Sequence, residues 1–430
     1  INYLILLSEE GKIGLRKFRN EEKELLLNLI NITIEDAEIV KAIETKGYED
    51  ILATNHDVKA IEYFIKLKLK NTSLSDILEY VHFCLTSEDI NNLSYSLMIK
   101  DGFNNGLYKE LINLYQSLYN LSIKYKDLPM LARTHGQSAT PTTFGKEILV
   151  FVSRLKEELK LLPNIKLLSK LNGATGGYNA FNVVFPNVDW QKFSEILINN
   201  LNDETNPLNL SFNKVTTQIE PHDSLGRIFD TIKRINTILI DFAQDMWRYI
   251  SDGWIKQRTV KGEIGSSAMP HKVNPIDFEN GEGNLGMANS LFNFFSGKLM
   301  VSRLQRDLSD STVLRNVGVA FAHTLLSYQS IMKGLSKIEV NEDEIINVLK
   351  NTPEIIAEAY QNILRVSGVE KPYELLKEVT RGKDIKIEDF HNLARKLNVS
   401  DKTKEKLLSI TPENYTGLSS KIVEEFESKI

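Results

Sequence analysis

Two long stretches of the chain place apolar residues on one face of an expected helix. Within 144–162 and within 225–246 the apolar positions step by three or four residues, which is the helical spacing. They are Phe144, Ile148, Phe151, Leu155, Leu159 and Leu162, then Leu225, Phe229, Ile232, Ile235, Leu239, Phe242 and Met246. Other apolar residues, such as Val150 and Ile240, flank these stripes. Each helix therefore needs partners on more than one side, as in a helical bundle.

The remaining pattern predicts three helical domains. Residues 281–300 carry a third apolar stripe, and shorter helical patterns with charged connections occupy both ends of the chain. We find no alternation of strands and helices and no glycine-rich phosphate loop. The expected fold is all-α, with an N-terminal helical domain (1–87), a central long-helix domain (88–335) and a C-terminal helical domain (336–430).

Composition narrows the class of protein. The chain has 430 residues, 42% of them hydrophobic and 25% charged, which is ordinary for a globular protein of two or three domains. Its net charge of −5 and the lack of a long basic block argue against a nucleic-acid partner. Cys84 is the only cysteine, which excludes an internal disulfide and favours a cytoplasmic location. No apolar run is long enough to span a membrane, so we expect no membrane partner.

The most informative stretch is 262–280, Gly-Glu-Ile-Gly-Ser-Ser-Ala-Met-Pro-His-Lys-Val-Asn-Pro-Ile-Asp-Phe-Glu-Asn. Its small residues suit a loop whose backbone N–H groups approach a ligand, and its two prolines stop a continuing helix. Asn274 and Pro275 are suited to begin the next helix, which would direct a helix dipole and Lys272 at one place. That arrangement favours an anion such as a carboxylate. A Gly/Ser/Pro surface loop is the simpler alternative.

Three other polar segments are candidates for ligand binding. His56 stands between Asn55 and Asp57, and His82 shortly precedes the hydroxyl and acid cluster that begins with Thr86 and Ser87. Both segments are also explained as helix starts, with Thr54 or Asn55 as the N-cap of the first. Residues 302–316 mix three arginines with serines and threonines. Such a run is usually a solvated face, but guanidinium groups beside hydroxyls also bind phosphate.

The string Gly-Ser-Ser-Ala-Met-Pro-His-Lys-Val-Asn-Pro, residues 265–275, resembles the signature of the fumarase/aspartase superfamily. The flanking residues 276–280 narrow the resemblance to the adenylosuccinate lyases. Similar segments occur at 53–60, 81–92, 133–141, 172–179, 216–223, 302–316, 370–374 and 380–383, so the resemblance extends from about Thr54 to the C-terminus.

The resemblance implies a fold, an assembly and a reaction. The fold would be all-α with three domains, and its long central bundle would be shared in a homotetramer whose active sites each use three subunits. The substrate would be a purine nucleotide: adenylosuccinate, giving AMP and fumarate, and the succinyl-carboxamide ribotide of purine synthesis. No metal or organic cofactor is implied.

The resemblance also assigns site residues. Ser266 would be the base and His135 the acid that protonates the leaving nitrogen, with Glu279 orienting the histidine ring. Because a serine hydroxyl is a weak base at neutral pH, His82 and His56 stay open as alternative bases. Positive charge must stabilise the carboxylate next to the carbanion. The residues implied to bind substrate are Asn55, His56, Asp57, Thr86, Ser87, Gln218, Ser267, Lys272, Val273, Asn274, Asn280, Arg306, Ser311, Thr312, Val313, Leu314 and Arg315.

Several alternatives stay open. Ser138 replaces a proline usual in the family, which should change local stiffness more than chemistry. The arginine–tyrosine pair that the family places near its N-terminus does not occur before Thr54, so we expect residues before Ile1. A related lyase acting on argininosuccinate or on fumarate and malate is possible, but His271 and the arginine-rich segment argue against it. A catalytically retired helical scaffold would have lost key residues such as Lys272, which is present.

Overall fold

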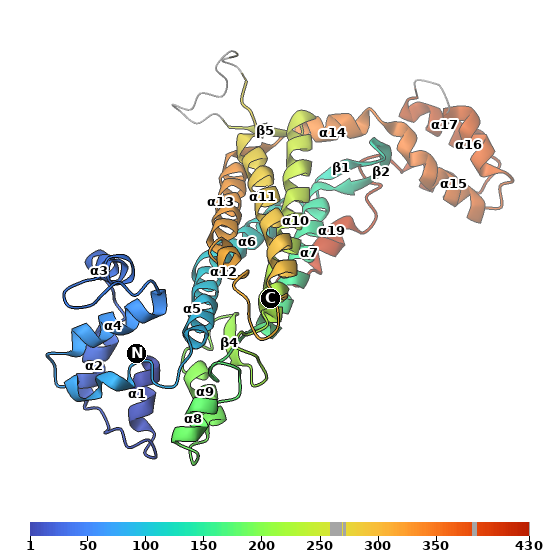
Figure 1. Ribbon diagram of the computed structural model, residues 1–430. Helices are drawn as coiled ribbons and strands as arrows, with labels where there is room; N and C mark the ends of the chain where they lie inside the picture. Colours follow the sequence, from blue (N-terminus) through green and yellow to red (C-terminus); the bar gives the residue numbers. More distant parts are fainter. Residues whose placement is uncertain (259–268, 270–271, 381–384, 430) are drawn as a thin grey trace. The chain divides into compact units, whose positions relative to one another are not determined.

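The computed structural model describes residues 1–258, 269, 272–380 and 385–429 (Figure 1). The chain divides into two compact units, each made from three stretches. Unit 1 comprises Ile1–Gly106, Leu162–Thr231 and Leu291–Gly318, and unit 2 comprises Leu107–Leu161, Ile232–Ser290 and Val319–Ile430. These units group the chain differently from three consecutive ranges, and the predicted boundaries at 87/88 and 335/336 stay a prediction.

Unit 1 contains short helices and one two-stranded sheet. Its elements are α1 (Asn2–Glu9), α2 (Asn20–Asn28), α3 (Ile34–Thr45), α4 (Asp57–Leu69), η1 (Ser75–Tyr80), α5 (Ser87–Asp101), η2 (Gly102–Leu107), η3 (Leu162–Asn164), β3 (Lys166–Ser169), α8 (Asn179–Val184), α9 (Trp190–Asn199), β4 (Asn209–Phe212) and α12 (Ser311–Leu314). The aromatic core between α8 and α9 pairs Phe181 with Trp190 edge to face at 4.9 Å between ring centroids.

Unit 2 holds two of the long helices and the C-terminal helices. Its elements are α6 (Tyr108–Lys124), β1 (Pro129–Thr134), β2 (Gln137–Thr143), α7 (Phe144–Leu161), β5 (Ile255–Gln257), β6 (Ile338–Val340), α14 (Glu342–Lys350), η4 (Pro353–Ile356), α15 (Ala357–Val366), α16 (Pro372–Thr380), α17 (Ile387–Lys396), α18 (Asp401–Leu408) and α19 (Ser419–Glu424). Three further long helices contribute residues to both units: α10 (Asp223–Ser251), α11 (Ile276–Lys298) and α13 (Val317–Lys337).

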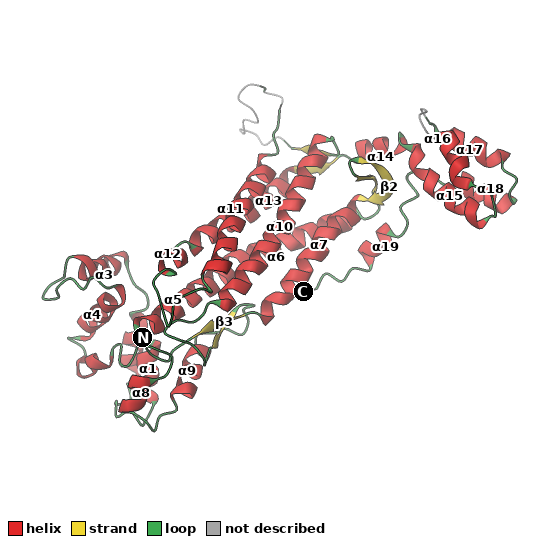
Figure 2. Cartoon of the chain, turned by 45° about the vertical axis from the view of Figure 1, so that its right-hand side comes forward, coloured by secondary structure: helices red, strands yellow, loops and turns green. Residues whose placement is uncertain are grey.

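The predicted apolar stripes are confirmed as core. Every stripe residue named for 144–162 and 225–246 is buried. In unit 2 the rings of Phe151 and Phe242 join α7 to α10, and Phe242 also contacts Phe278 of α11. A Cβ on Gly334 of α13 would come within 2.9 Å of the Phe278 ring, so the glycine permits close helix packing. Figures 1 and 2 show α10, α11 and α13 side by side.

The C-terminal helices of unit 2 have their own apolar core. Buried residues of α14, η4 and α15–α18 form it together with Leu131 of β1, and Tyr360 and Phe390 pack edge to face at 5.1 Å between ring centroids. The hydroxyl of Tyr360 donates to the carbonyl of Leu407 at 2.8 Å, so its polar end is satisfied inside the core.

The structure confirms an all-α class, and its described residues also contain three small two-stranded sheets. β1 and β2 form an antiparallel hairpin with an irregularity between Leu131 and Arg133. β3 and β4 pair in parallel and are connected through α8 and α9, so the absence of strand and helix alternation read from the sequence is wrong here. Each of these strands has four residues, which is too short for a clear alternating pattern.

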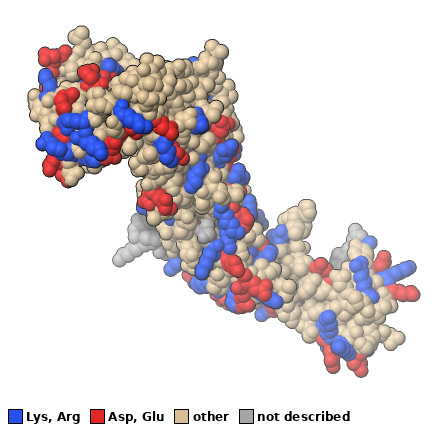
Figure 3. Space-filling view, turned by 90° about the horizontal axis from the view of Figure 1, so that it is seen from below, with Lys and Arg blue, Asp and Glu red and all other residues tan. Residues whose placement is uncertain are grey.

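Among the described residues, no helix is both long and apolar enough to cross a membrane. On the face shown in Figure 3, acidic and basic side chains are interspersed.

Candidate active site

The first predicted pair that the structure brings together is His56 and Ser87. His56, not Thr54 or Asn55, is the N-cap of α4: its Nδ1 accepts from the amide of Lys59 at 3.3 Å, while the Thr54 hydroxyl bonds to the His56 backbone. Because Nδ1 accepts a hydrogen bond, the neutral ring carries its proton on Nε2. Nε2 lies 3.3 Å from Ser87 Oγ, so His56 donates to that oxygen. The hydroxyl proton of Ser87 is then available to a ligand.

A second contact series joins the start of α5 to the arginine-rich segment. Arg306 pairs with Glu88 at 3.2 Å and donates from Nη1 to Gln218 Oε1 at 3.1 Å. Burial raises the pKa of the Glu88 carboxyl, and the charge of Arg306 opposes that rise. A hollow of about 500 Å³ lies here, lined by Gln218, Arg306 and their neighbours Ala174, Thr175, Leu304, Gln305, Asp307 and Leu308. Two predicted ligand groups therefore face one concave site in unit 1.

The rest of the arginine-rich segment forms the short helix α12 and its C-terminal end. Ser311 is half-buried, Thr312 and Arg315 are exposed, and the side chains of Val313 and Leu314 are buried. In their backbones, the amide of Leu314 donates to the carbonyl of Asp310 and the carbonyl of Val313 accepts from the amide of Asn316. The charges of Arg315 and of Asp57 both act on the phenol of Tyr95 in α5. Burial raises the pKa of Tyr95, and Arg315 counteracts this.

His135 lies at the tip of the β1–β2 hairpin. Thr134 pairs with Gln137, so His135 and Gly136 form a two-residue turn, and both have positive φ (54° and 74°). Two positive φ values are the signature of a type I′ turn. The histidine is exposed and belongs to unit 2.

The signature stretch is described only in part. Ser266, Ser267 and His271 lie outside the described residues. Lys272 and Val273 are exposed, Asn274 is half-buried, and the carbonyl of Val273 accepts from Gln257 Nε2 at 2.9 Å. α11 begins at Ile276, directly after Pro275, as predicted to within one residue.

Glu279, on the first turn of α11, and Asn280, the next residue, are both exposed. The carboxylate of Glu279 accepts from the indole of Trp247 at 3.1 Å. Among the described residues of one chain, no hydrogen bond joins Glu279 to His135. The orientation of His135 by Glu279 stays a prediction.

His82 lies in a different environment from His56. It has a positive φ of 64° and lines a mainly apolar pocket with Tyr3, Val58, Ile61, Glu62 and others. Burial lowers the pKa of its imidazole, which favours the neutral ring. A neutral imidazole can accept a proton, so His82 keeps the chemistry of an alternative base.

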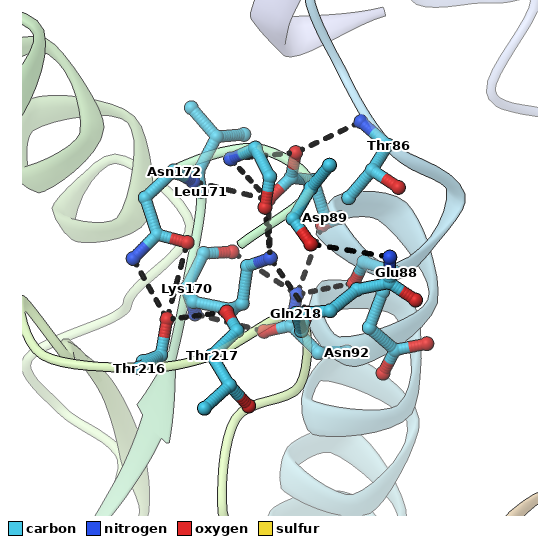
Figure 4. Close-up of polar contacts among 12 residues, drawn as sticks. Thr86, Glu88, Asp89, Asn92, Lys170, Leu171, Asn172, Thr216, Thr217 and Gln218 are labelled. Carbon is cyan, nitrogen blue, oxygen red and sulfur yellow. Dashed lines mark hydrogen bonds and ion pairs between the residues drawn. The ribbon is translucent and has the colours of Figure 1, made fainter. Parts of the chain in front are cut away.

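Sequence reasoning missed the buried polar network behind this site. Asp89 and Lys170 form an ion pair at 3.1 Å with both side chains fully buried, and Asn92 and Asn172 extend it (Figure 4). A lysine inside the apolar run Leu-Leu-Ser-Lys-Leu was the available signal, because lysine is almost never fully buried unless paired. Within the described residues, no group of three or more His, Cys, Asp or Glu side chains is placed to hold a metal.

Two family models match the chain. A lyase model matches residues 19–288, and an adenylosuccinate lyase C-terminal model matches residues 302–416. Among solved structures, the chain resembles a fumarate lyase from Mesorhizobium sp. BNC1 with a TM-score of 0.75 at 16% identity, covering 98% of this chain and 92% of the other. A 3-carboxy-cis,cis-muconate lactonizing enzyme from Pseudomonas putida gives a TM-score of 0.73 at 19% identity, covering 98% and 91%.

Curated relatives are much more similar in sequence. The adenylosuccinate lyase of Escherichia coli K12 is 46% identical over 394 residues, covering 91% of this chain and 83% of the relative. That of Haemophilus influenzae is 47% identical over 395 residues, covering 92% and 84%. That of Vibrio cholerae is 46% identical over 440 residues, covering 98% and 95%.

The helical fold and the matched lyase model define a lyase of the fumarase/aspartase superfamily. At the level of sequence, this chain belongs to the adenylosuccinate lyase family.

Proposed function

We propose that this protein is a carbon–nitrogen lyase that eliminates fumarate from adenylosuccinate and leaves AMP. The observation that carries the proposal is similarity of about 46% over nearly the whole chain to enzymes named adenylosuccinate lyase. The contacts that bring Ser87, Gln218 and Arg306 to one side of unit 1 support it. The succinyl-carboxamide ribotide of purine synthesis carries the same succinyl group on nitrogen, so it is the second proposed substrate.

The nucleotide end of the substrate fits the arginine-rich segment. A phosphate presents several oxygens and negative charge, and guanidinium groups bind it with charge-assisted hydrogen bonds. Arg306 and Arg315 supply these groups, and Ser311 and Thr312 supply hydroxyls. His56, Asn55 and Asp57, with Thr86 and Ser87, would bind other polar atoms of the nucleotide.

The reacting end requires a base, an acid and stabilisation of a carbanion. We assign the base to Ser266, with Ser267 beside it, and His82 as the alternative. Lys272 and Asn274 would stabilise the carboxylate next to the carbanion, because positive charge placed where negative charge develops lowers the barrier. His135 would protonate the leaving nitrogen, since imidazole titrates near neutral pH.

The same proposal includes a homotetramer with shared sites. Large apolar side chains stay exposed on the long helices of the single chain, among them Val150, Trp247, Met287, Phe294 and Leu326. Exposed apolar residues on bundle helices are what an assembly would cover. His135 is exposed at a hairpin tip, so it is accessible to a neighbouring subunit.

The test is direct. Purified protein is mixed with adenylosuccinate, and AMP and fumarate are followed by chromatography. We expect both products in equal amounts. Argininosuccinate, malate and fumarate are run in parallel, and turnover of one of these in place of adenylosuccinate would assign the chain to a related reaction. Absence of turnover with every substrate would favour a non-catalytic scaffold.

A further inference from the structure

The ammonium group of Lys170 is the centre of a buried polar network in unit 1. Its Nζ donates to the carbonyl of Gly173 at 2.8 Å and to the carbonyl of Gln218 at 2.7 Å, and lies 3.1 Å from Asp89 Oδ1 (Figure 4). The side chain has no exposed surface. One lysine thus fixes the backbone of Gln218, whose own side chain accepts from Arg306.

Asp89 extends the network to the start of α5. Its carboxylate accepts from the amide of Thr86 at 3.0 Å, which completes a capping box, and from the amides of Asn172 and Gly173 at 3.0 and 3.2 Å. The same carboxylate therefore holds the helix start that presents Ser87 and the loop that follows β3.

Two amide side chains complete the connection. Asn92 accepts from the amide of Lys170 at 2.8 Å and donates to its carbonyl at 3.0 Å, which fixes the lysine backbone against α5. Asn172 donates at 2.8 Å to the hydroxyl of Thr216, which is two residues before Gln218 in sequence. Three segments, at 86–92, 170–173 and 216–218, are thereby held in one arrangement.

The energetics argue that this arrangement serves more than stability. Burying two charges costs several kcal/mol per ion, and replacement of such a pair by apolar residues is often neutral or stabilising. Burial lowers the pKa of Lys170 although Asp89 opposes this, so desolvation is the larger effect. The charged pair adds directional hydrogen bonds that apolar packing cannot supply. Lys170 bonds two backbone carbonyls, and Asp89 bonds three backbone amides.

We propose that Lys170 and Asp89 are positioning residues that set Gln218 and Ser87 at the correct relative position for the substrate. The inference rests on the proposed function. Neither residue touches the substrate; Lys170 acts through the backbone of Gln218, and Asp89 through the first turn of α5.

The experiment compares two neutral double variants. Asp89→Asn/Lys170→Met removes both charges and the donor, whereas Asp89→Asn/Lys170→Gln removes both charges but keeps an amide donor at position 170. The single variant Lys170→Met leaves the Asp89 charge buried and unpaired, so its melting temperature should fall most. The double variants should recover much of that loss. Lys166→Met, at an exposed position of β3, is the control and should behave like wild type.

The Michaelis constant separates positioning from structure. We expect the Met double variant to raise the Michaelis constant for adenylosuccinate about tenfold or more, with kcat changed much less, since the loss is one of substrate contacts. The Gln double variant should lie between it and wild type. A stable Met double variant with a wild-type Michaelis constant would overturn the positioning role. Lack of wild-type turnover would contradict the proposed function itself, and the positioning role with it.

A milder variant covers the case in which neither double variant folds. Thr216→Val keeps the buried charges and the side-chain size but removes the hydroxyl that bonds Asn172 and the carbonyl of Thr217. We expect a several-fold rise in the Michaelis constant at a nearly unchanged melting temperature. An unchanged Michaelis constant in this variant would contradict the inference.

Discussion

At the scale of single residues, the direction of each hydrogen bond determines what a ligand meets. His56 accepts the amide of Lys59 with Nδ1, so its Nε2–H donates to Ser87 and leaves the serine proton for a substrate oxygen. Protonation of His56 would break the cap bond, because Nδ1 could no longer accept. In the proposed nucleotide site, this one imidazole would serve both as the helix cap and as the partner of Ser87.

Two arginines of the arginine-rich segment, Arg306 and Arg303, suit a comparison of alanine variants. The Arg306 side chain is 21% exposed and contacts Glu88 and Gln218, whereas Arg303 is 83% exposed and pairs with Asp307 of its own loop. We expect Arg306→Ala to raise the Michaelis constant for adenylosuccinate about 10- to 100-fold, from loss of about 1.5–3 kcal/mol in charged hydrogen bonds. Arg303→Ala should stay within about twofold of wild type, as surface pairs contribute little.

Steady-state kinetics with adenylosuccinate check this prediction, and thermal melting checks that Arg306→Ala still folds with Glu88 unpaired. Equal Michaelis constants for the two variants would contradict the assignment of Arg306 to the nucleotide.

Candidate residues could be found from the sequence, but their partners could not. The hydroxyl and acid cluster at Thr86 and the arginines near Arg306 are visible in the sequence as composition and spacing. These segments are distant in sequence and are connected through Glu88 and Gln218. A single sequence does not reveal which distant residues are in contact. The capping role of His56 was missed because Thr and Asn are much commoner N-caps than His.

At the scale of elements, length decided what was predictable. The helices α7 and α10 repeat their apolar spacing over several turns, so the sequence predicted both helices and their buried faces correctly. The β1–β2 hairpin was missed because Gln-Ser-Ala-Thr-Pro-Thr-Thr has few apolar residues and its turn, His135-Gly136, is not the usual Asn-Gly or Asp-Gly.

Helix α10 allows a pH-dependent prediction. Burial and the negative charges of Asp241 and Glu147 raise the pKa of Asp245 to about 6. The folded state therefore keeps this proton between about pH 4 and 6 while the unfolded state loses it, so the contribution to stability falls as pH rises through that window. We expect Asp245→Asn to be more stable than wild type above pH 6, by about 1–2 kcal/mol after allowing for partial exposure.

Thermal unfolding at pH 4 and at pH 7.5 measures this effect. The advantage of Asp245→Asn should become small at pH 4, where Asp245 is protonated in the folded state and about half protonated in the unfolded state, whose pKa is 3.8. Glu157→Gln on α7 is the control, since Glu157 pairs with Lys160 at the surface and should change stability little. A gain for Asp245→Asn that is equal at both pH values would exclude charge as its cause.

At the scale of the whole molecule, the exposed apolar residues of the long helices predict assembly. Leu326 on α13 is 50% exposed and Met287 on α11 is 55% exposed. A carboxylate introduced at a buried subunit interface would be costly, so Leu326→Asp should reduce the fraction of tetramer. Multi-angle light scattering should show smaller species and assays should show lower activity. A wild-type protein that is an active monomer at micromolar concentration would contradict the assembly.

The last whole-molecule prediction concerns how one active site is built. Glu279 bonds Trp247 rather than His135 within the chain, and His135 stands exposed on its hairpin. Both observations are expected if His135 completes the site of a neighbouring subunit. Ser266→Ala and His135→Ala should each fold and bind substrate but lose turnover, the first for want of a base and the second for want of an acid.

Mixing the two inactive variants tests that arrangement. If Ser266 and His135 of one site come from different chains, hybrid tetramers contain some sites with both native groups, and part of the activity should return. Subunit exchange is verified first with differently tagged chains, because unmixed tetramers would stay inactive for a trivial reason. No recovery in verified hybrids would place both groups in one chain. Substantial turnover by Ser266→Ala alone would move the base to His82 or His56, and of these His82 has the environment that favours a neutral ring.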